Sequence, residues 1–169
     1  MEIKILKVGY LQTNCYILTK GTSTIIIDPG DEAEKIKKEI KQKIKAILLT
    51  HHHFDHIGAI KEFKNIKILD NTNLEEKEYK IDDFIFQVIK TKGHTSDSIS
   101  FYFKEENIMF TGDFVFKNTI GRTDLETGNM KEMEESIEKI KKYPKATKLY
   151  PGHGELTTIE EEIKNNPFF

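Results

Sequence analysis

Histidine is concentrated in one short stretch of this 169-residue chain. Residues 50–59 read THHHFDHIGA, so four of the six histidines and one aspartate lie between positions 51 and 56. Imidazole nitrogens and carboxylate oxygens are ligands that zinc, iron and manganese accept in proteins. The stretch therefore predicts a metal site.

Three further potential ligands stand apart from this stretch, each beside a glycine or a threonine. They are His94 in KGHT, Asp113 in TGD and His153 in PGHG. Each follows an apolar run that ends in Thr, Gly or Pro, as the histidine stretch also does. Loops at the ends of neighbouring strands converge at one edge of a sheet. We therefore expect these three side chains to meet the histidine stretch.

The spacing within the stretch predicts two ligand sets. Residues two apart in an extended loop point to the same side, so His51 and His53 can hold one ion. Asp55 and His56, after a turn, can face a second ion. His52 alternates away from both, which predicts a packing or supporting role at most. An expression tag or a solvated loop explains the pattern less well, because the stretch is internal and interrupted by Phe54.

The isolated ligands complete a predicted two-metal centre. His94 and His153 can each join one set, and the carboxylate of Asp113 can bridge both ions. Ions paired in this way lie roughly 3.5–4 Å apart and share a hydroxide. A position left open on each ion is typical of a catalytic site. Asp55 is then also the candidate catalytic residue, because it can orient the hydroxide.

Apolar runs punctuated by Gly and Pro predict the strands of an α/β sandwich. These runs lie at 3–8, 15–18, 23–30, 45–50, 66–69, 84–90, 98–103, 107–111 and 147–150. Apolar residues at helical spacing predict a helix from Asp31 to Ile44, a short one around Ile57 and a longer one capped by Asn129. Thr158 and Glu161 resemble a capping box that opens a final helix. Residues 112–128 are predicted to be irregular, and 1–169 to form a single domain.

Composition limits the possible partners. Lys and Arg total 26 against 28 Asp and Glu, so the formal charge is −2 and no basic footprint for nucleic acid is expected. No apolar run approaches the ~18 residues of a membrane span. The N-terminal residues mix charged and apolar side chains, which predicts a strand and a cytoplasmic protein. Cys15, the only cysteine, is expected in the core. A small-molecule substrate is expected, and the oligomeric state is left open.

The motifs together resemble those of the metallo-β-lactamase superfamily. HHHFDHIGA resembles its H-x-H-x-D-H signature, and KGHT, TGD and PGHG resemble its remaining metal motifs. TNCYIL (13–18), IIDPG (26–30) and GRTDL (121–125) look most like the hydroxyacylglutathione hydrolase (glyoxalase II) and persulfide dioxygenase branch. The resemblance implies a four-layered αβ/βα sandwich with the metals at the edge of two sheets.

Residue by residue, the resemblance also implies the ligand sets and a shortened site. One ion would be held by His51, His53 and His94, and the other by Asp55, His56 and His153, with Asp113 between them. Glyoxalase II enzymes carry a C-terminal helical extension, whereas this sequence ends at Phe169. The segment from Leu69 to Phe84 is also shorter than in that family. Both differences predict a small or open pocket.

The function expected is hydrolysis of thioesters such as hydroxyacylglutathione-like compounds by a metal-bridged hydroxide. Zinc is the first expectation for the two divalent ions, with iron and manganese as alternatives. A mononuclear iron persulfide dioxygenase and a non-catalytic metal-binding module are the competing hypotheses.

Three further residues lie near the motifs. Arg122 is the only arginine; it is expected to form a buried fork with Asp124, or else to bind a substrate carboxylate. Tyr150 is a candidate for substrate contact or for the core. Asn14 is expected in a turn.

Overall fold

The computed structural model describes residues 1–169 and contains two large β-sheets packed face to face. The first sheet has five strands in the order of the chain: β1 (Glu2–Val8), β2 (Thr13–Lys20), β3 (Ser23–Ile27), β4 (Lys43–Leu48) and β5 (Lys67–Leu69). The second has six, in the spatial order β13 (Thr157–Thr158), β12 (Lys148–Pro151), β9 (Ile108–Gly112), β8 (Ile99–Phe103), β7 (Phe84–Lys90) and β6 (Glu78–Ile81). A separate hairpin pairs β10 (Val115–Phe116) with β11 (Thr119–Ile120).

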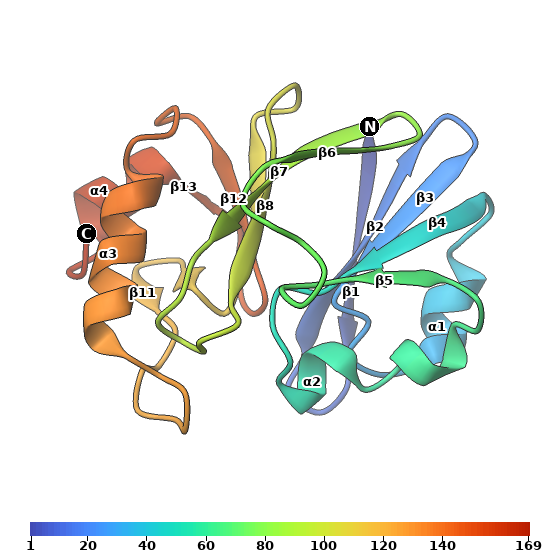
Figure 1. Ribbon diagram of the computed structural model, residues 1–169, viewed down its shortest axis with the longest axis horizontal. Helices are drawn as coiled ribbons and strands as arrows, with labels where there is room; N and C mark the ends of the chain where they lie inside the picture. Colours follow the sequence, from blue (N-terminus) through green and yellow to red (C-terminus); the bar gives the residue numbers. More distant parts are fainter.

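Helices cover the outer face of each sheet, as Figure 1 shows. The first sheet carries α1 (Ala33–Lys38), α2 (Phe54–Ile57) and the 3₁₀ turn η1 (Ile60–Glu62), and the second carries α3 (Met130–Ile140) and α4 (Ile159–Asn165). The predicted α/β sandwich, with helical layers outside two sheets, is therefore the observed architecture. None of these helices has the length and apolarity needed to cross a membrane.

Strand alternation distributes the apolar side chains among three layers of core. Ile25 and Ile27 face the space between the sheets, whereas Ile26 faces the helical layer on the other side. In the second sheet Phe110 joins the central layer and Met109 packs towards α3. Successive side chains of a strand point to opposite faces, so a continuous apolar run is what a strand buried on both faces requires.

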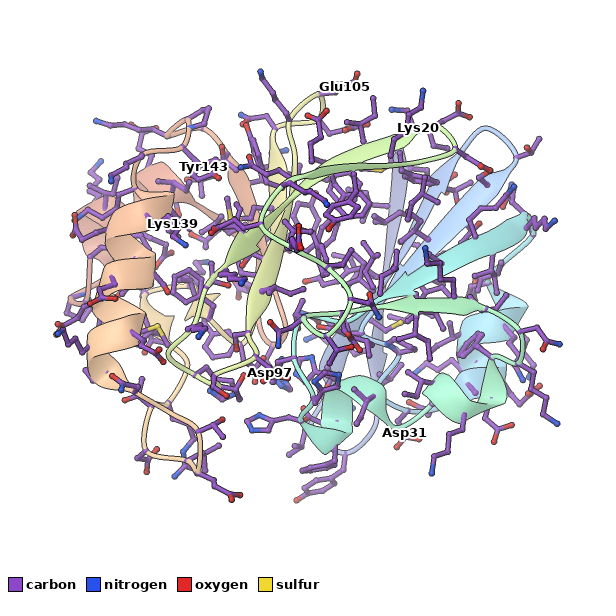
Figure 2. The ribbon with its side chains drawn as sticks, viewed as in Figure 1. Lys20, Asp31, Asp97, Glu105, Lys139 and Tyr143 are labelled. Atoms are coloured by element: carbon purple, nitrogen blue, oxygen red, sulfur yellow. The ribbon has the colours of Figure 1, made fainter.

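Parallel pairing brings the chemically interesting strand ends to one edge. β3, β4 and β5 run parallel, so the residues that follow them lie at the same end of the first sheet. In the second sheet β9 and β12 run parallel. β7 runs in the same direction as β9, because both are antiparallel to β8. Figure 2 places Asp31 and Asp97 near this end, with Lys20 and Glu105 at the opposite one.

Several predicted elements differ from those observed. The helix expected from Asp31 to Ile44 ends at Lys38, because Ile44 belongs to β4, where it pairs with Thr24. β6 lies in a segment for which no strand was predicted, and β10 and β11 lie within 112–128, which was predicted to be irregular. Asn14 is buried in β2 and not in a turn. The caps of the last two helices were predicted correctly: Asn129 accepts from the N–H of Glu132 and Thr158 from that of Glu161.

Candidate metal centre

The structure brings all seven predicted ligands together at the edge between the two sheets. Their ligand atoms form overlapping groups, in each of which the atoms lie within 4.8 Å of one another. We call the group of His51, His53 and His94 the imidazole cluster, and the group of Asp55, His56 and His153 the carboxylate cluster. Asp113 joins them, grouping with His51 and His56.

The imidazole cluster combines both sheets. His51 and His53 come from the loop after β4, and His94 comes from the loop after β7. His53 Nδ1 lies 3.2 Å from His51 Nε2 and 2.9 Å from His94 Nε2. Three ring nitrogens that converge on one point in this way can bind the same ion.

The carboxylate cluster is similarly assembled. His153 Nε2 lies 3.1 Å from Asp55 Oδ2 and 3.5 Å from Asp113 Oδ2. His56 Nε2 lies 3.3 Å from Asp113 Oδ1 and 3.5 Å from Asp55 Oδ2. Asp113 Oδ2 is also 3.7 Å from His94 Nε2, so this carboxylate stands between the two clusters.

Supporting hydrogen bonds fix which nitrogen each ring presents. Asp28 accepts at Oδ2 from His56 Nδ1 at 2.9 Å, and it also accepts from the backbone N–H and hydroxyl of Thr50. The carbonyl oxygens of Arg122 and Leu11 contact the Nδ1 atoms of His94 and His153 at 2.8 and 3.1 Å. These contacts leave the Nε2 atoms directed at the centre, the usual arrangement for metal-binding histidines.

Glycine makes the close approach of the ligands possible. A Cβ atom at Gly152 would overlap Asp113 Oδ1 and His56 Cε1, so only glycine fits between these ligands. A Cβ atom at Gly30 would overlap the carbonyl oxygen of Asp55. The glycines of the PGHG and DPG segments therefore allow the loops to pack against the ligands.

The two clusters differ in their affinity for protons. Burial lowers the pKa of His51 well below its usual range, and the nearby His56 lowers it further. Burial also lowers the pKa of His53, with His94 contributing. In the carboxylate cluster burial opposes protonation of His56, but Asp28 and Asp113 outweigh it and raise the pKa to about 10. Burial likewise opposes protonation of His153, whose pKa is raised by its hydrogen bond with Asp55.

The buried polar atoms of the centre indicate that a cation belongs there. His56 Nε2 and Asp113 Oδ1 are buried and form no hydrogen bond, although they lie 3.3 Å from each other. Leaving a buried polar atom unpaired costs about 1–3 kcal/mol, and more for a charged group. Burial would raise the pKa of Asp113, yet His56 and other imidazoles lower it to about 2, so the group is an anion at neutral pH. A nitrogen and oxygen donor set with these unpaired atoms fits divalent metal ions.

Comparison with known proteins agrees with this geometry. The sequence profile of the metallo-beta-lactamase superfamily matches residues 8–71 and 65–153, segments that contain every ligand. This chain belongs to the metallo-beta-lactamase superfamily.

Individual relatives within the superfamily resemble it over nearly their whole length. The hydroxyacylglutathione hydrolase GloC of Haemophilus influenzae is 31% identical over 99% of this chain and 98% of its own. The crystal structure of the B3 metallo-beta-lactamase BLEG-1 has a TM-score of 0.93 and 35% identity, and the match covers 99% of each chain. The structure of TTHA1623 in a di-iron-bound form has a TM-score of 0.89 and 30% identity, covering 98% of this chain and 100% of that one.

His52 lies outside both clusters. Its Nε2 is 3.1 Å from Asp70 Oδ2, and its Nδ1 contacts Asp97, so the ring joins the loops after β5 and β7. Burial opposes protonation, but these two carboxylates raise the pKa of His52 above its usual value. The alternation of side chains along the extended loop explains why it turns away while its neighbours converge.

The structure shows the contacts and burial of Arg122 and Tyr150. Arg122 forms the expected fork with Asp124, at 2.7 and 2.8 Å. The expected burial of this pair is wrong, because both side chains are more than half exposed. Tyr150 is 9% exposed and packs in the core against Phe110 and Tyr16. Its position favours packing over contact with a substrate.

Cys15 is buried as expected, and burial raises the pKa of its thiol.

Three supporting residues were missed in the sequence. Asp28 ends a strand in the same way as the ligands, within IIDPG, and that signal could have found it. Thr13 donates from Oγ1 to Asp55 Oδ2 at 2.8 Å. Asn14 donates from Nδ2 to the carbonyl oxygens of Pro151 and Gly154, so it holds the loop that carries His153. No local pattern predicts a hydrogen bond between positions 14 and 151.

Proposed function

We propose that this protein is a hydrolase that uses two divalent metal ions to cleave thioesters, with hydroxyacylglutathione-like compounds as the substrate class. The convergence of seven side chains of metal-ligating type, four of them between residues 51 and 56, is the observation that carries the proposal. The name of the GloC relative supports the substrate class. Zinc is the proposed metal, and the di-iron form of TTHA1623 supports iron as the alternative.

The ions would supply the electrophilic chemistry. Two divalent ions held by these ligands would polarise a carbonyl oxygen and lower the pKa of coordinated water from 15.7 to near 7. The protein supplies the positioning. Asp55 Oδ2 is oriented by the hydroxyl of Thr13 and lies beside His153, so this carboxylate can accept a hydrogen bond from the attacking water and direct it.

A cavity beside Asp55 supports an acyl substrate. Its volume is about 180 Å³, and its apolar lining comes from Val8, Tyr10, Leu11 and Phe54. Tyr10 and Phe54 are 97% and 75% exposed, which is unusual for side chains of this size. An apolar group that covered them would be held next to the metal centre. We assign the acyl part of the substrate to this cavity.

A thioester suits the arrangement because its leaving group needs no proton. A thiol has an ordinary pKa near 8.5, so it can depart as the thiolate close to neutral pH. The leaving group of an amide or an ordinary ester is a much stronger base, so its departure requires a general acid.

The Arg122 guanidinium is engaged by Asp124, so we assign this pair to holding its surface loop. The alternative role predicted for Arg122, direct contact with a substrate carboxylate, is tested by R122K.

The proposal is tested with protein of defined metal content. The chain is stripped with a chelator and reloaded with zinc, iron or manganese, and the metal per chain is measured. Each form is then assayed against thioesters, lactones and phosphodiesters. Two ions per chain and turnover of thioesters are expected. Metal binding without turnover of any thioester would overturn the proposal and favour the non-catalytic module.

The same experiment distinguishes the proposed hydrolase from an iron oxygenase. That alternative predicts one iron per chain and oxygen uptake with a persulfide. The observation against it is that Asp55, His56 and His153 converge as completely as the imidazole cluster, although a single ion would need only the latter. One iron with oxygen uptake would replace the hydrolase assignment.

A further inference from the structure

A second buried carboxylate lies outside the metal centre. Glu162 of α4 is 0% exposed, although it belongs to a surface helix. Oε2 accepts from the backbone N–H of Asn118 at 2.9 Å and from Asn166 Nδ2 at 2.7 Å. Oε1 accepts from the hydroxyl of Thr157 at 2.5 Å. Three donors to one buried carboxylate fix its position.

These bonds hold the tip of the β10–β11 hairpin. Only two residue pairs join its strands, and a hairpin of this size is not stable without other contacts. Asn118 at the tip has a φ of 62°, a left-handed conformation that asparagine tolerates. Asn166 adds a second link, because its Nδ2 also donates to the carbonyl oxygen of Thr119 at 2.9 Å. The end of the chain therefore anchors the hairpin.

The anchored hairpin forms one wall beside the metal centre. The Phe116 ring packs edge-on against the ring of His153, with 6.1 Å between centroids. Lys117 forms an ion pair with Glu155 in the loop after His153. Between the hairpin and this loop lies an open cavity of about 450 Å³.

This hairpin cavity differs from the cavity beside Asp55. Phe116 is its only hydrophobic lining residue, and the rest of the lining includes Asn118, Thr119 and the Lys117–Glu155 ion pair. An amide, a hydroxyl and a paired ammonium and carboxylate offer both hydrogen-bond donors and acceptors to a polar ligand. It is also the larger of the two, at about 450 Å³ against 180 Å³. The two cavities therefore suit the two unlike halves of one substrate.

We propose that Glu162 is a positioning residue that fixes the hairpin tip, and that the hairpin cavity receives the polar thiol-carrier arm of the substrate. The second half of this assignment rests on the proposed thioester hydrolysis, whereas the first does not. Glu162 acts through the hairpin and touches neither the substrate nor the metal ligands.

The positioning role is tested by hydrogen exchange in the full chain. Glu162→Met keeps the side-chain volume but removes the acceptor for all three donors, so faster exchange is expected at residues 116–120 and not in the sheets. Glu162→Gln retains one acceptor oxygen and should restore most of the protection. Glu160→Met, on the exposed side of the same helix, is the matched control. Unchanged exchange at 116–120 in Glu162→Met would overturn the role.

The carrier assignment is tested by kinetics on zinc-loaded protein. Two thioesters of the same 2-hydroxyacyl group are compared, one on glutathione and one on the much shorter N-acetylcysteamine. In Glu162→Met we expect KM for the glutathione thioester to rise about fivefold, with kcat within about twofold. KM for the short thioester should not change. An equal rise in both KM values, or no rise, would overturn the carrier assignment.

The two experiments distinguish failure of the proposed function from failure of the role of Glu162. If the wild-type protein cleaves neither thioester, the proposed function and the carrier assignment fail, but hydrogen exchange still decides the role of Glu162. If Glu162→Met does not fold, Glu162→Gln and Asn166→Ala test the anchoring, since Asn166→Ala removes both the bond to Thr119 and one of the three donors to the Glu162 carboxylate. Slower or unchanged exchange at 116–120 in Asn166→Ala would then count against anchoring by α4.

Discussion

The two clusters of the metal centre use different means to attract a cation. In the imidazole cluster His51 and His53 have lowered pKa values, because burial disfavours a charged ring. In the carboxylate cluster His56 and His153 have raised pKa values, because Asp28, Asp55 and Asp113 surround them. An ion entering the first cluster finds His51 and His53 neutral, whereas one entering the second must displace a proton from His56.

This difference follows from where the carboxylates sit. Asp28 supports His56 from behind, while His51 Nδ1 has only the hydroxyl of Thr50 at 3.1 Å. The same negative charges that hold a proton on His56 also attract a metal ion. The carboxylate cluster therefore attracts a metal ion more strongly, but protons compete with the ion for its ligands. The imidazole cluster attracts the ion less strongly and meets less competition from protons.

Removing a ligand of the imidazole cluster should have the largest effect. His53→Ala deletes the ring that lies within 3.2 Å of His51 and 2.9 Å of His94. Activity should fall by at least about 100-fold, and bound metal should decrease from two ions towards one, as measured by elemental analysis. Circular dichroism should stay unchanged, because His53 is on the rim and outside the hydrophobic clusters. Retention of more than a few per cent of wild-type activity would contradict the assignment.

Weakening the support of the carboxylate cluster should have the next largest effect. Asp28→Asn keeps the shape but removes the charge behind His56, and loss of such a partner typically costs about 10- to 100-fold in metal affinity. Chelator competition should show this loss for one ion and little change for the other. Asp31→Asn, an exposed neighbour, is the control. Equal weakening of both ions would show that the clusters are not distinct.

The pH dependence of metal binding should separate the clusters directly. The pKa of His56, raised to about 10, keeps this ring protonated at neutral pH until metal displaces the proton, and the raised pKa of His153 acts in the same direction. Affinity of the carboxylate cluster should therefore rise about tenfold per pH unit for each proton displaced, while that of the imidazole cluster changes less near pH 7. Calorimetry in buffers of different ionisation enthalpy measures the protons released. Equal proton release for both ions would refute the comparison.

A change at His52 should have the smallest effect. His52→Gln removes the contacts with Asp70 and Asp97 but no ligand. We expect about a threefold loss of activity and unchanged metal content, because the segment 51–56 keeps its four ligands and the hydrogen bonds that orient them. Loss of an ion in this variant would place His52 among the residues that determine metal binding.

Much of the fold was predictable because several strands, including β3, β8 and β9, are buried on both faces. The runs at 84–90, 98–103 and 107–111 became β7, β8 and β9 with ends shifted by at most one residue. The helix expected to reach Ile44 was too long, because helical spacing continued by chance into β4. The β10–β11 hairpin was missed because the bonds that hold its tip come from Glu162 and Asn166, more than 40 positions away.

The sequence by itself determined which residues meet at the candidate metal centre. Ligand type, the alternation from His51 to His53 and the glycine-flanked strand ends are local properties that one chain reveals without its fold. Only the tertiary structure decided that Asp28 supports His56, that Asn14 holds the His153 loop, and that the Arg122 fork is exposed. The physical reason is that hydrogen-bond partners, burial and the pKa values that depend on them are set by packing between distant segments, which spacing along the chain does not encode.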